Sequence, residues 1–251
     1  MPYTDSTNYY GSLCTEMYEL LHAQPDEEEL DLYLSYARPE MKILEPLCGS
    51  GRMLIPFLRR GYDITGMDLS AEMLDRLRQK APEARAIQAN LIGYRTDERY
   101  DYIFIPSGSI VLFTDLTLCR EILTALRGML REDGVLVFSV DTVASRSPDD
   151  AEYREDIRVQ TPEGLTLTLR TKHRYDPDTQ TQFSPEIYEL FDGGRLLRQE
   201  EMDFQTHLYR PGEMEELLQA AGFTRVVCYA SHRKEAFTGG CPEMLLYECR
   251  P

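Results

Sequence analysis

The spacing of apolar residues changes along the chain and predicts its elements. Between residues 41 and 141, short apolar runs alternate with longer segments in which apolar residues recur every three or four positions. The short runs predict buried strands, and the longer segments predict amphipathic helices. Strands separated by helices of this length indicate a parallel sheet that is covered on both faces. The expected strands are 42–47, 62–67, 84–89, 100–106 and 135–140, and the expected helices are 51–60, the segment after Ser70, and 115–130.

Two helices are expected before the first strand. Residues 12–23 place leucine and methionine side chains on one helical face, with Ser12 in the position of an N-cap. The second helix is expected to begin at Pro25, because acidic residues follow in the first turn and favour the helix dipole. It is expected to end at Arg38-Pro39, since a residue before proline disfavours helical backbone.

After Thr142 the apolar residues follow a period of two. A polar, acidic stretch at 145–156 predicts a loop, and the alternating segments after it are separated by turns rich in Asp, Pro and Gly. This pattern predicts an antiparallel meander inserted at residues 142–209. The alternating segments are 165–171, 181–191 and 195–207.

Helical spacing returns after Pro211, and two further apolar runs follow it. We expect a helix that has Gly222 as its C-cap, then closing strands at 223–231 and 243–249. The prediction is therefore an N-terminal region at 1–40, a core formed by 41–141 and 210–251, and the insertion at 142–209.

The charge of the chain limits the partners that it can bind. A net charge of −16 repels phosphate backbones and anionic lipid surfaces, which argues against nucleic acid or membrane as a partner. It is compatible with a small neutral or cationic substrate. No apolar run approaches the roughly 20 residues that cross a bilayer, and residues 1–10 lack the character of a secretory signal. We therefore expect a cytoplasmic protein, either a monomer or a homodimer.

The cysteines and histidines do not form a recognisable metal site. Six cysteines are scattered without a Cys-x-x-Cys pair, and the four histidines are also dispersed. Free thiols are therefore expected in place of disulfides or zinc ligands.

The stretch from Ile43 to Asp68 carries the clearest chemical pattern. An apolar strand leads into Gly49-Ser50-Gly51, an apolar helix follows, and a second strand ends at Asp68. This order is typical of the first half of a nucleotide-binding βαβ unit. The glycines allow a ligand to approach the backbone, and a helix beginning at Gly51 would offer free N–H groups. Asp68 is placed to accept hydrogen bonds from both ribose hydroxyls.

Two residues of this stretch indicate which nucleotide is bound. Leu54 occupies the position where a dinucleotide site has its third glycine. Glu45 adds a carboxylate at the end of the first strand, which would repel a pyrophosphate but suits an amino group or a positive charge. S-adenosylmethionine has an amino group, a sulfonium and a ribose, and therefore fits the pattern.

Residues Glu45-Pro46-Leu47-Cys48-Gly49-Ser50-Gly51 and Gly66-Met67-Asp68-Leu69-Ser70 resemble motif I and the following acidic strand end of class I S-adenosylmethionine-dependent methyltransferases. This resemblance implies a doubly wound, seven-stranded, mostly parallel Rossmann-like α/β fold. The inserted meander and residues 213–223 resemble the small-molecule N-methyltransferases of the glycine/sarcosine and amino-sugar types. In these enzymes the N-terminal helices close over the cofactor, and the extra sheet forms a roof or a subunit interface.

The resemblance and the strand order together imply a cofactor site. Ligands of such sheets bind beyond the carboxyl ends of the strands, which brings the polar strand ends together. Asn90 stands where the family often has an acid that accepts a hydrogen bond from the adenine amino group, and its oxygen can do the same. Leu69 and Leu91 are placed to sandwich the ring. The expected cofactor-binding residues are Glu45, Cys48, Gly49, Ser50, Gly51, Asp68, Leu69, Met73, Asn90, Leu91 and Ser107.

Methyl transfer is an in-line displacement, so alignment supplies much of the acceleration, and an amine acceptor can react without a general base. A hydroxyl acceptor benefits from one. The candidate bases are His173, His207 and the tyrosines Tyr10 and Tyr175; the candidate substrate-binding residues are Tyr9, Tyr18, Arg174 and Arg210, the arginines for a substrate carboxylate.

Three functions are consistent with the sequence. The first is a methyltransferase that acts on an amine or hydroxyl of a small molecule. The second is a nicotinamide-dependent oxidoreductase, against which Glu45 and Leu54 count. The third is a non-catalytic module that binds an adenosyl group.

Overall fold

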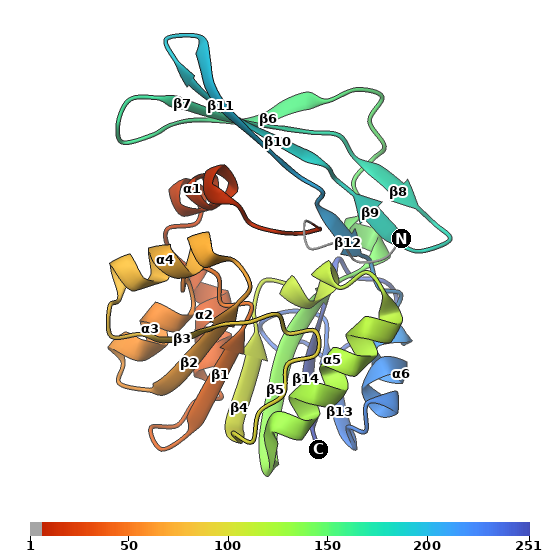
Figure 1. Ribbon diagram of the computed structural model, residues 1–251. Coiled ribbons are helices and arrows are strands. Elements are labelled where there is room, and N and C mark those ends of the chain that lie inside the picture. The colour runs from red at the N-terminus through yellow and green to blue at the C-terminus, as the bar shows by residue number, and fades with distance from the viewer. Residues whose placement is uncertain (1–6) are drawn as a thin grey trace.

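A seven-stranded sheet forms the centre of the computed structural model, which describes residues 7–251 (Figure 1). Residues 1–6 lie outside the described residues. They belong to the predicted N-terminal region and to the segment 1–10, in which no secretory signal is expected. Strands β1 to β5 run parallel, and β14 lies antiparallel between β5 and β13. The order is β13-β14-β5-β4-β1-β2-β3. The strands are β1 (Lys42–Pro46), β2 (Asp63–Asp68), β3 (Arg85–Gln88), β4 (Tyr100–Ile105), β5 (Leu130–Asp141), β13 (Arg225–Tyr229) and β14 (Met244–Arg250).

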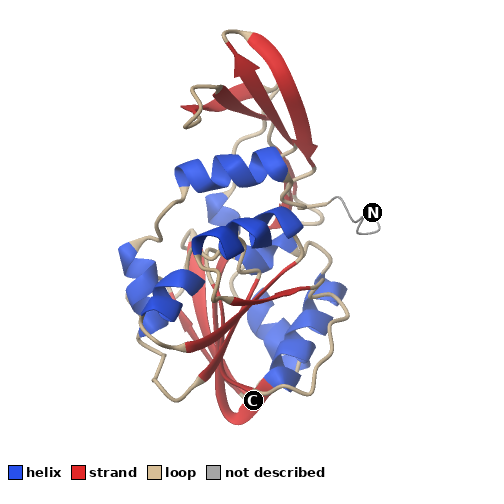
Figure 2. Cartoon of the chain, turned by 60° about the vertical axis from the view of Figure 1, so that its left-hand side comes forward, coloured by secondary structure: helices blue, strands red, loops and turns tan. Residues whose placement is uncertain are grey.

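The mostly parallel α/β sheet confirms the predicted fold class. Helices cover both of its faces, as Figure 2 shows. Alternate side chains of β4 divide between the two layers: Tyr102 and Phe104 pack into one apolar cluster, and Ile103 and Ile105 into the other. Burial on both faces explains why the four residues from Tyr102 to Ile105 are all apolar. One layer contains α2 (Glu27–Leu34), α3 (Leu54–Arg59) and α4 (Ala71–Lys80), and the other contains α5 (Leu116–Met129) and α6 (Glu213–Ala220).

Helix α3 begins later than the sequence suggested. Gly51 has a φ of +85°, which lies in the left-handed region and cannot belong to a right-handed helix. Its N–H donates to the Cys48 carbonyl over 2.9 Å and closes a turn. The expectation of free helix N–H groups at Gly51 is therefore wrong, because the helix starts three residues further on.

The insertion forms two antiparallel sheets, where the sequence predicted one meander. The four-stranded sheet has the order β11-β10-β7-β6, and the three-stranded sheet has the order β12-β9-β8. The expected loop at 145–156 is wrong at its end, because β6 begins at Arg154. These strands are β6 (Arg154–Gln160), β7 (Thr166–Thr171), β8 (Arg174–Asp176), β9 (Thr181–Phe183), β10 (Glu186–Asp192), β11 (Arg195–Met202) and β12 (Gln205–His207).

Two of the three predicted strands of the insertion are interrupted. Segment 181–191 divides into β9 and β10 at Ser184-Pro185, where proline has no N–H to donate to a strand ladder. Segment 195–207 divides into β11 and β12 at Asp203, whose carbonyl accepts the Asn8 N–H over 3.2 Å. The N-terminal segment therefore joins the insertion at this break.

Helix α1 (Ser12–Leu21) lies between the four-stranded sheet and the core (Figures 1 and 2). Its buried side chains, among them Leu13 and Met17, pack on Leu167 and Tyr188 of β7 and β10. Ser12 is not its N-cap. The Glu200 carboxylate of β11 instead accepts the N–H groups of Leu13 and Cys14, each over 3.1 Å.

Helix α2 also begins later than predicted. It starts at Glu27, and the preceding Asp26 acts as the N-cap by accepting the Glu29 N–H over 2.9 Å. An aspartate side chain that satisfies an otherwise free N–H group is a stronger start signal than the proline before it.

Candidate cofactor site and adjoining cavity

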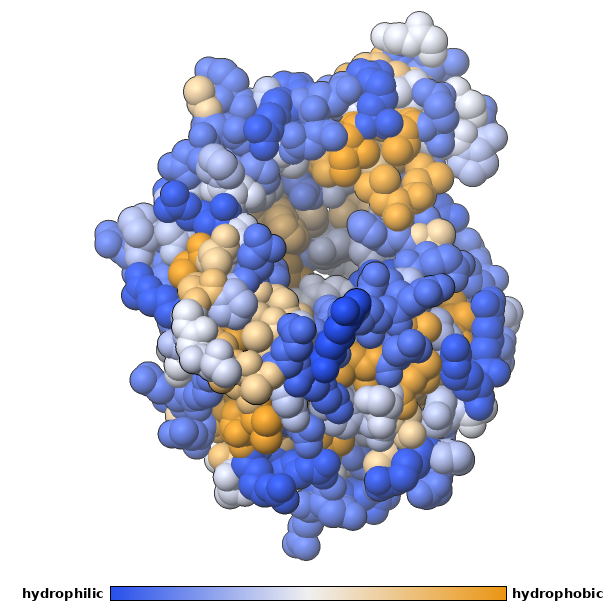
Figure 3. Space-filling view, turned by 180° about the vertical axis from the view of Figure 1, so that it is seen from behind, coloured by the Kyte–Doolittle hydropathy of each residue, from blue (hydrophilic) through white to orange (hydrophobic). Residues whose placement is uncertain are grey.

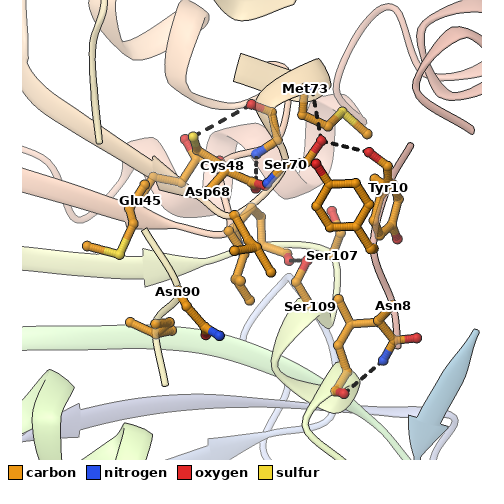
Figure 4. Close-up of a pocket in the computed structure, with 18 of the residues that line it drawn as sticks. Asn8, Tyr10, Glu45, Cys48, Asp68, Ser70, Met73, Asn90, Ser107 and Ser109 are labelled. Atoms are coloured by element: carbon orange, nitrogen blue, oxygen red, sulfur yellow. Dashed lines mark hydrogen bonds between the residues drawn. The ribbon is translucent and has the colours of Figure 1, made fainter. Parts of the chain in front are cut away.

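A cavity opens at the carboxyl ends of the neighbouring strands β1 and β4, where the strand order reverses; Figure 4 shows side chains that line it. The N-terminal segment and α1 form its other side. Such a position is where doubly wound sheets bind their ligands. Its lining residues are Thr7, Asn8, Tyr9, Tyr10, Tyr18, Glu45, Leu47, Cys48, Gly49, Arg52, Met53, Met67, Asp68, Leu69, Ser70, Met73, Ala89, Asn90, Leu91, Pro106, Ser107, Ser109, Leu112 and Phe113.

Asp68, at the end of β2, is held by backbone N–H groups of the loops that follow β1 and β2. One carboxylate oxygen accepts the Gly49 N–H over 2.8 Å, and the other accepts the Ser70 N–H over 2.9 Å. Burial raises the pKa of Asp68, while these N–H donors act against the shift. Each oxygen keeps a second lone pair, so the carboxylate can accept a further bond from each of two vicinal hydroxyls.

Glu45 presents a carboxylate oxygen without a partner. The residue is 1% exposed, and its Oε2 has no hydrogen-bond partner among residues 7–251. Burial raises the pKa of Glu45 well above its usual range, and the nearby Arg52 guanidinium acts against the shift. A buried carboxylate oxygen that lines the cavity and has no donor fits the amino group of S-adenosylmethionine.

Arg52 is a site residue that the sequence did not single out. It is the one cationic side chain among the residues that line this cavity. Its guanidinium lies 3.7 Å from the buried Glu29 carboxylate and donates to the Ser107 hydroxyl. Ser107 in turn donates its N–H to Glu29 over 2.5 Å. In the sequence, only its position directly after Gly51 pointed to this arginine. Its partner Glu29 is far away along the chain, so their contact was not visible there.

Asn90 and the two leucines lie at one end of the cavity. The Asn90 oxygen accepts the Ile92 N–H over 2.9 Å, and this bond holds the turn after β3. Leu91 is 3% exposed and Leu69 is 38% exposed, and both line the cavity. The exposed face of Leu69 is therefore available to an aromatic ring.

Close packing explains two of the glycines. A Cβ on Gly66 would lie 2.6 Å from both Cys48 Sγ and Leu54 Cδ1, and one on Gly51 would lie 2.5 Å from Leu77 Cδ1. Gly66 thus lets β2 approach the loop after β1, even though Leu54 occupies the third-glycine position. This packing of Leu54 against Gly66 keeps the helix close to the sheet.

The structure brings most of the predicted cofactor residues together. Ser50 and Gly51 are the exceptions, because neither lines the cavity. The buried Ser50 hydroxyl instead contacts Glu19 and Lys80 on α1 and α4, and so ties the motif loop to two helices. The predicted residues that line the cavity are Glu45, Cys48, Gly49, Asp68, Leu69, Met73, Asn90, Leu91 and Ser107.

The tyrosines predicted to contact the substrate also line this cavity. Tyr9 donates its hydroxyl to Glu72 over 2.7 Å, and the Tyr10 and Tyr18 rings meet edge to face with centroids 6.4 Å apart. Burial raises the pKa of Tyr10 well above its usual range. A phenol of this kind stays protonated at neutral pH, so Tyr10 is a hydrogen-bond donor and not a ready base.

The histidines and arginines predicted for catalysis and substrate binding do not line the cavity. His173 follows β7, and its Nδ1 lies 2.8 Å from the Ser184 hydroxyl. His207 is 2% exposed on β12, and its Nε2 lies 3.4 Å from the Glu213 carboxylate. Arg174 lies over the Phe183 ring at 4.4 Å, and Arg210 is exposed and engaged through its N–H with Glu213; Tyr175 lies under the Arg146 guanidinium.

A second cavity adjoins the first, and the molecule is hollowed between the inserted sheets and the core (Figure 3). The two cavities share Tyr10, Ser107, Ser109 and Leu112. The remaining walls come from the end of β5, the turn after it, and strands β9 and β12. The other lining residues are Gly108, Val111, Asp141, Ser145, Ser147, Gln182, Phe204, Thr206 and Leu208.

Among residues 7–251, no group of three or more His, Cys, Asp or Glu side chains is arranged to hold a metal ion. No helix in this part of the chain is long and apolar enough to cross a membrane.

Part of the chain is similar in sequence to known proteins. Residues 43–134 match the family described as "Methyltransferase domain". Bacillus subtilis YqeM, provisionally named a methyltransferase, is 26% identical over 153 residues, which cover 56% of this chain and 61% of that protein. The Escherichia coli tRNA 5-carboxymethoxyuridine methyltransferase is 28% identical over 137 residues, 52% of this chain and 51% of its own length. The chain thus matches only about half to three fifths of these two relatives.

Solved structures match over nearly the whole chain. The CcbJ methyltransferase from Streptomyces caelestis has a TM-score of 0.77 at 20% identity and covers 98% of this chain and 99% of its own. The sugar N-methyltransferase KedS8 from Streptoalloteichus has a TM-score of 0.74 at 19% identity, with 100% and 98% coverage. The amino pentose methyltransferase CalS10 from Micromonospora echinaspora, solved with S-adenosylmethionine, has a TM-score of 0.68 at 18% identity, with 94% and 97% coverage. The likeness includes the inserted sheets.

Proposed function

We propose that this chain, whose residues 43–134 match a methyltransferase domain, is an S-adenosylmethionine-dependent methyltransferase that transfers the methyl group to a small molecule held in the second cavity. The observation that carries this proposal is the shared wall of the two cavities, formed by Tyr10, Ser107, Ser109 and Leu112. Because the same four residues line both cavities, an acceptor in the second cavity would lie beside a cofactor in the first.

The cofactor cavity offers a partner for each polar part of S-adenosylmethionine. Asp68 would accept the ribose hydroxyls, and the unpartnered Glu45 oxygen would accept the amino group. Arg52, held by Glu29, would bind the carboxylate at the amino-acid end. Leu69 and Leu91 would enclose the adenine ring, with Asn90 at its edge.

The bound cofactor supplies an electrophilic methyl group on a positively charged sulfur. The contribution of this chain to the reaction is to place an acceptor atom in line with that group and to exclude water. Alignment of this kind contributes up to about 7–11 kcal/mol to a reaction between two bound molecules. Enclosure by the N-terminal segment and the inserted sheets therefore serves catalysis directly, and a dedicated histidine base is not required.

A nucleic acid substrate is the second candidate, because a tRNA methyltransferase is among the relatives. That similarity covers 52% of this chain. The net charge of −16 and a second cavity without a cationic side chain favour a small molecule instead.

The test is methyl transfer from S-adenosylmethionine labelled in the methyl group, with a panel of small amines and alcohols in one arm and total tRNA in the other. We expect label in small molecules and none in tRNA; label confined to tRNA would overturn the proposed acceptor class. Thermal shift with S-adenosylhomocysteine and with NAD tests the cofactor. Stabilisation by NAD alone would overturn the methyltransferase assignment.

Substitution of Asp68 by alanine tests the binding mode of the cofactor. Loss of a carboxylate that bonds both hydroxyls is expected to weaken S-adenosylhomocysteine binding by about 10- to 100-fold, since a charged hydrogen bond contributes about 1.5–3 kcal/mol. Calorimetric titration measures the change, and Asp133→Ala, at the opposite end of the sheet, is the matched control. An unchanged affinity in Asp68→Ala would show that the ribose binds elsewhere.

A further inference from the structure

The second cavity contains one ionisable carboxylate, Asp141, at the end of β5. The carboxylate lies against the Gly108 backbone, where a Cβ would be 3.5 Å from Oδ2 and 3.6 Å from Oδ1. The other titratable side chain that lines the cavity is Tyr10, and no lysine, arginine or histidine lines it. The cavity is therefore acidic at one point and lacks a compensating cation.

Asp141 differs from three other acids near the cofactor site, all of which have partners. Glu29 bonds Ser107 and Arg52, Glu200 caps α1, and Asp68 accepts two backbone N–H groups. The Asp141 side chain has no hydrogen bond or ion pair with any of residues 7–251. Burial alone raises its pKa, with no donor or cation opposing the shift. A partly buried carboxylate without a partner is unfavourable unless a ligand supplies one.

Gln182 of β9 is a second residue of the same cavity with an acceptor that has no donor. It is 5% exposed, and its Oε1 has no hydrogen-bond partner in the described part of the chain. The hydroxyls of Ser109 and Ser145, which also line the cavity, already donate to the carbonyls of Pro106 and Thr142 over 2.9 and 2.8 Å. The cavity thus combines two acceptors that have no donor with a lining that has no cationic side chain.

We propose that Asp141 binds the amino group of the methyl acceptor, with Gln182 as a second acceptor for its hydrogen atoms, so that the substrate is a primary or secondary amine. This inference rests on the proposed function and adds the residue that recognises the acceptor. An ammonium offers the positive charge that this cavity lacks, together with N–H donors for its unpaired acceptors. A carboxylate or phosphate acceptor would be repelled by Asp141.

The proton balance of the reaction agrees with this placement. An acceptor that enters as an ammonium gives one proton to the Asp141 carboxylate or to water and gains a free lone pair. The nitrogen then forms a bond to the methyl carbon as the bond from that carbon to sulfur breaks, and the electron pair of the broken bond stays on sulfur. The methylated ammonium releases its extra proton to water. Asp141 holds the remaining N–H groups and so orients the lone pair.

The experiment measures binding to the full chain loaded with S-adenosylhomocysteine. The probes are two matched pairs, glucosamine with glucose and benzylamine with benzyl alcohol, titrated by calorimetry or ligand-observed NMR. We expect at least one amine to bind about tenfold or more tightly than its alcohol, and Asp141→Asn to remove about 10- to 100-fold of amine affinity. Gln182→Leu should weaken amine binding but keep the preference for amine over alcohol.

Asp178→Asn, an exposed substitution in the turn between β8 and β9, is the control and should leave both affinities unchanged. S-adenosylhomocysteine should bind Asp141→Asn as it binds the unchanged chain, which shows that the variant is folded. Equal binding of amine and alcohol, full amine affinity in Asp141→Asn, or no amine binding at all would each overturn the inference. Methylation of an alcohol would overturn it too and leave the proposed function standing, whereas failure to bind S-adenosylhomocysteine would overturn the proposed function itself.

Discussion

At the scale of single residues, Glu45 has opposite effects on two properties: it lowers the stability of the free protein and favours cofactor binding. Its carboxylate is buried without a full set of partners, which destabilises the free protein, yet the same oxygen is available to an ammonium. Functional sites commonly hold such groups, because a ligand completes them.

Glu45→Gln is therefore expected to change two measurements in different directions. Affinity for S-adenosylhomocysteine should fall by about tenfold or more, because a charged hydrogen bond is replaced by a neutral one. The free energy of unfolding of the ligand-free chain should stay unchanged or rise, since a carboxyl whose ionisation burial disfavours is replaced by a group that does not ionise. Urea unfolding and calorimetric titration provide the two values, with the exposed Glu132→Gln as control. A parallel loss of stability and affinity would mean that Glu45 is mainly structural.

At the scale of elements, strand β10 contains a titrating carboxyl group. Burial raises the pKa of Glu186 to about 7, Asp156 adds to the shift, and the Tyr188 hydroxyl, which donates to Glu186, opposes it. The ordinary value of a glutamate is 4.5. Between these two pKa values the folded state holds a proton that the unfolded chain has released, so the stability of the fold decreases as the pH rises.

Glu186→Gln should abolish this decrease in stability with rising pH. Relative to the unchanged chain, the variant is expected to gain up to about 3 kcal/mol of unfolding free energy between about pH 5 and pH 8, and nothing below about pH 4. Urea unfolding at a series of pH values measures the difference. Glu201→Gln on the neighbouring strand β11 is exposed and should show no such trend. The same pH slope in Glu186→Gln and in the unchanged chain would assign the titration to another group.

Elements of this protein were predictable where their signals are local. The apolar run of β4 and the apolar face of α5 lie within the segments that they define. The start of α1 at Ser12 was predicted, but its capping group was not, because Glu200 is 187 residues away from Leu13. The division of 195–207 likewise depends on Asn8, and the two donor-free acceptors of the second cavity come from β5 and β9. Motif residues define the cofactor site in the sequence, whereas the acceptor cavity exists only through contacts between distant segments.

At the scale of the whole molecule, Asn8 joins the inserted sheets to the core. Its Nδ2 donates to the Leu112 and Gln205 carbonyls, each over 2.9 Å, and its Oδ1 accepts the Gln205 N–H over 2.8 Å. Leu112 lies in the core layer and Gln205 in β12, so one side chain holds the two parts beside the wall that the cavities share. The φ of Asn8 is +56°, a region that asparagine tolerates better than most residues.

Loss of this connection should affect stability and cofactor binding together, because the segment that Asn8 anchors also lines the cofactor cavity. Asn8→Ala removes three hydrogen bonds and places alanine at positive φ, and it is expected to lower the free energy of unfolding by about 2–4 kcal/mol. Asn8→Gly removes the same bonds without the backbone strain, so it should lose about 1 kcal/mol less. Both variants should weaken S-adenosylhomocysteine binding to the same extent, since the anchoring of residues 7–10 is lost in each. Urea unfolding measures the stability, and calorimetric titration measures the cofactor affinity. Full cofactor affinity in both variants would show that residues 7–10 stay in place without the Asn8 side chain.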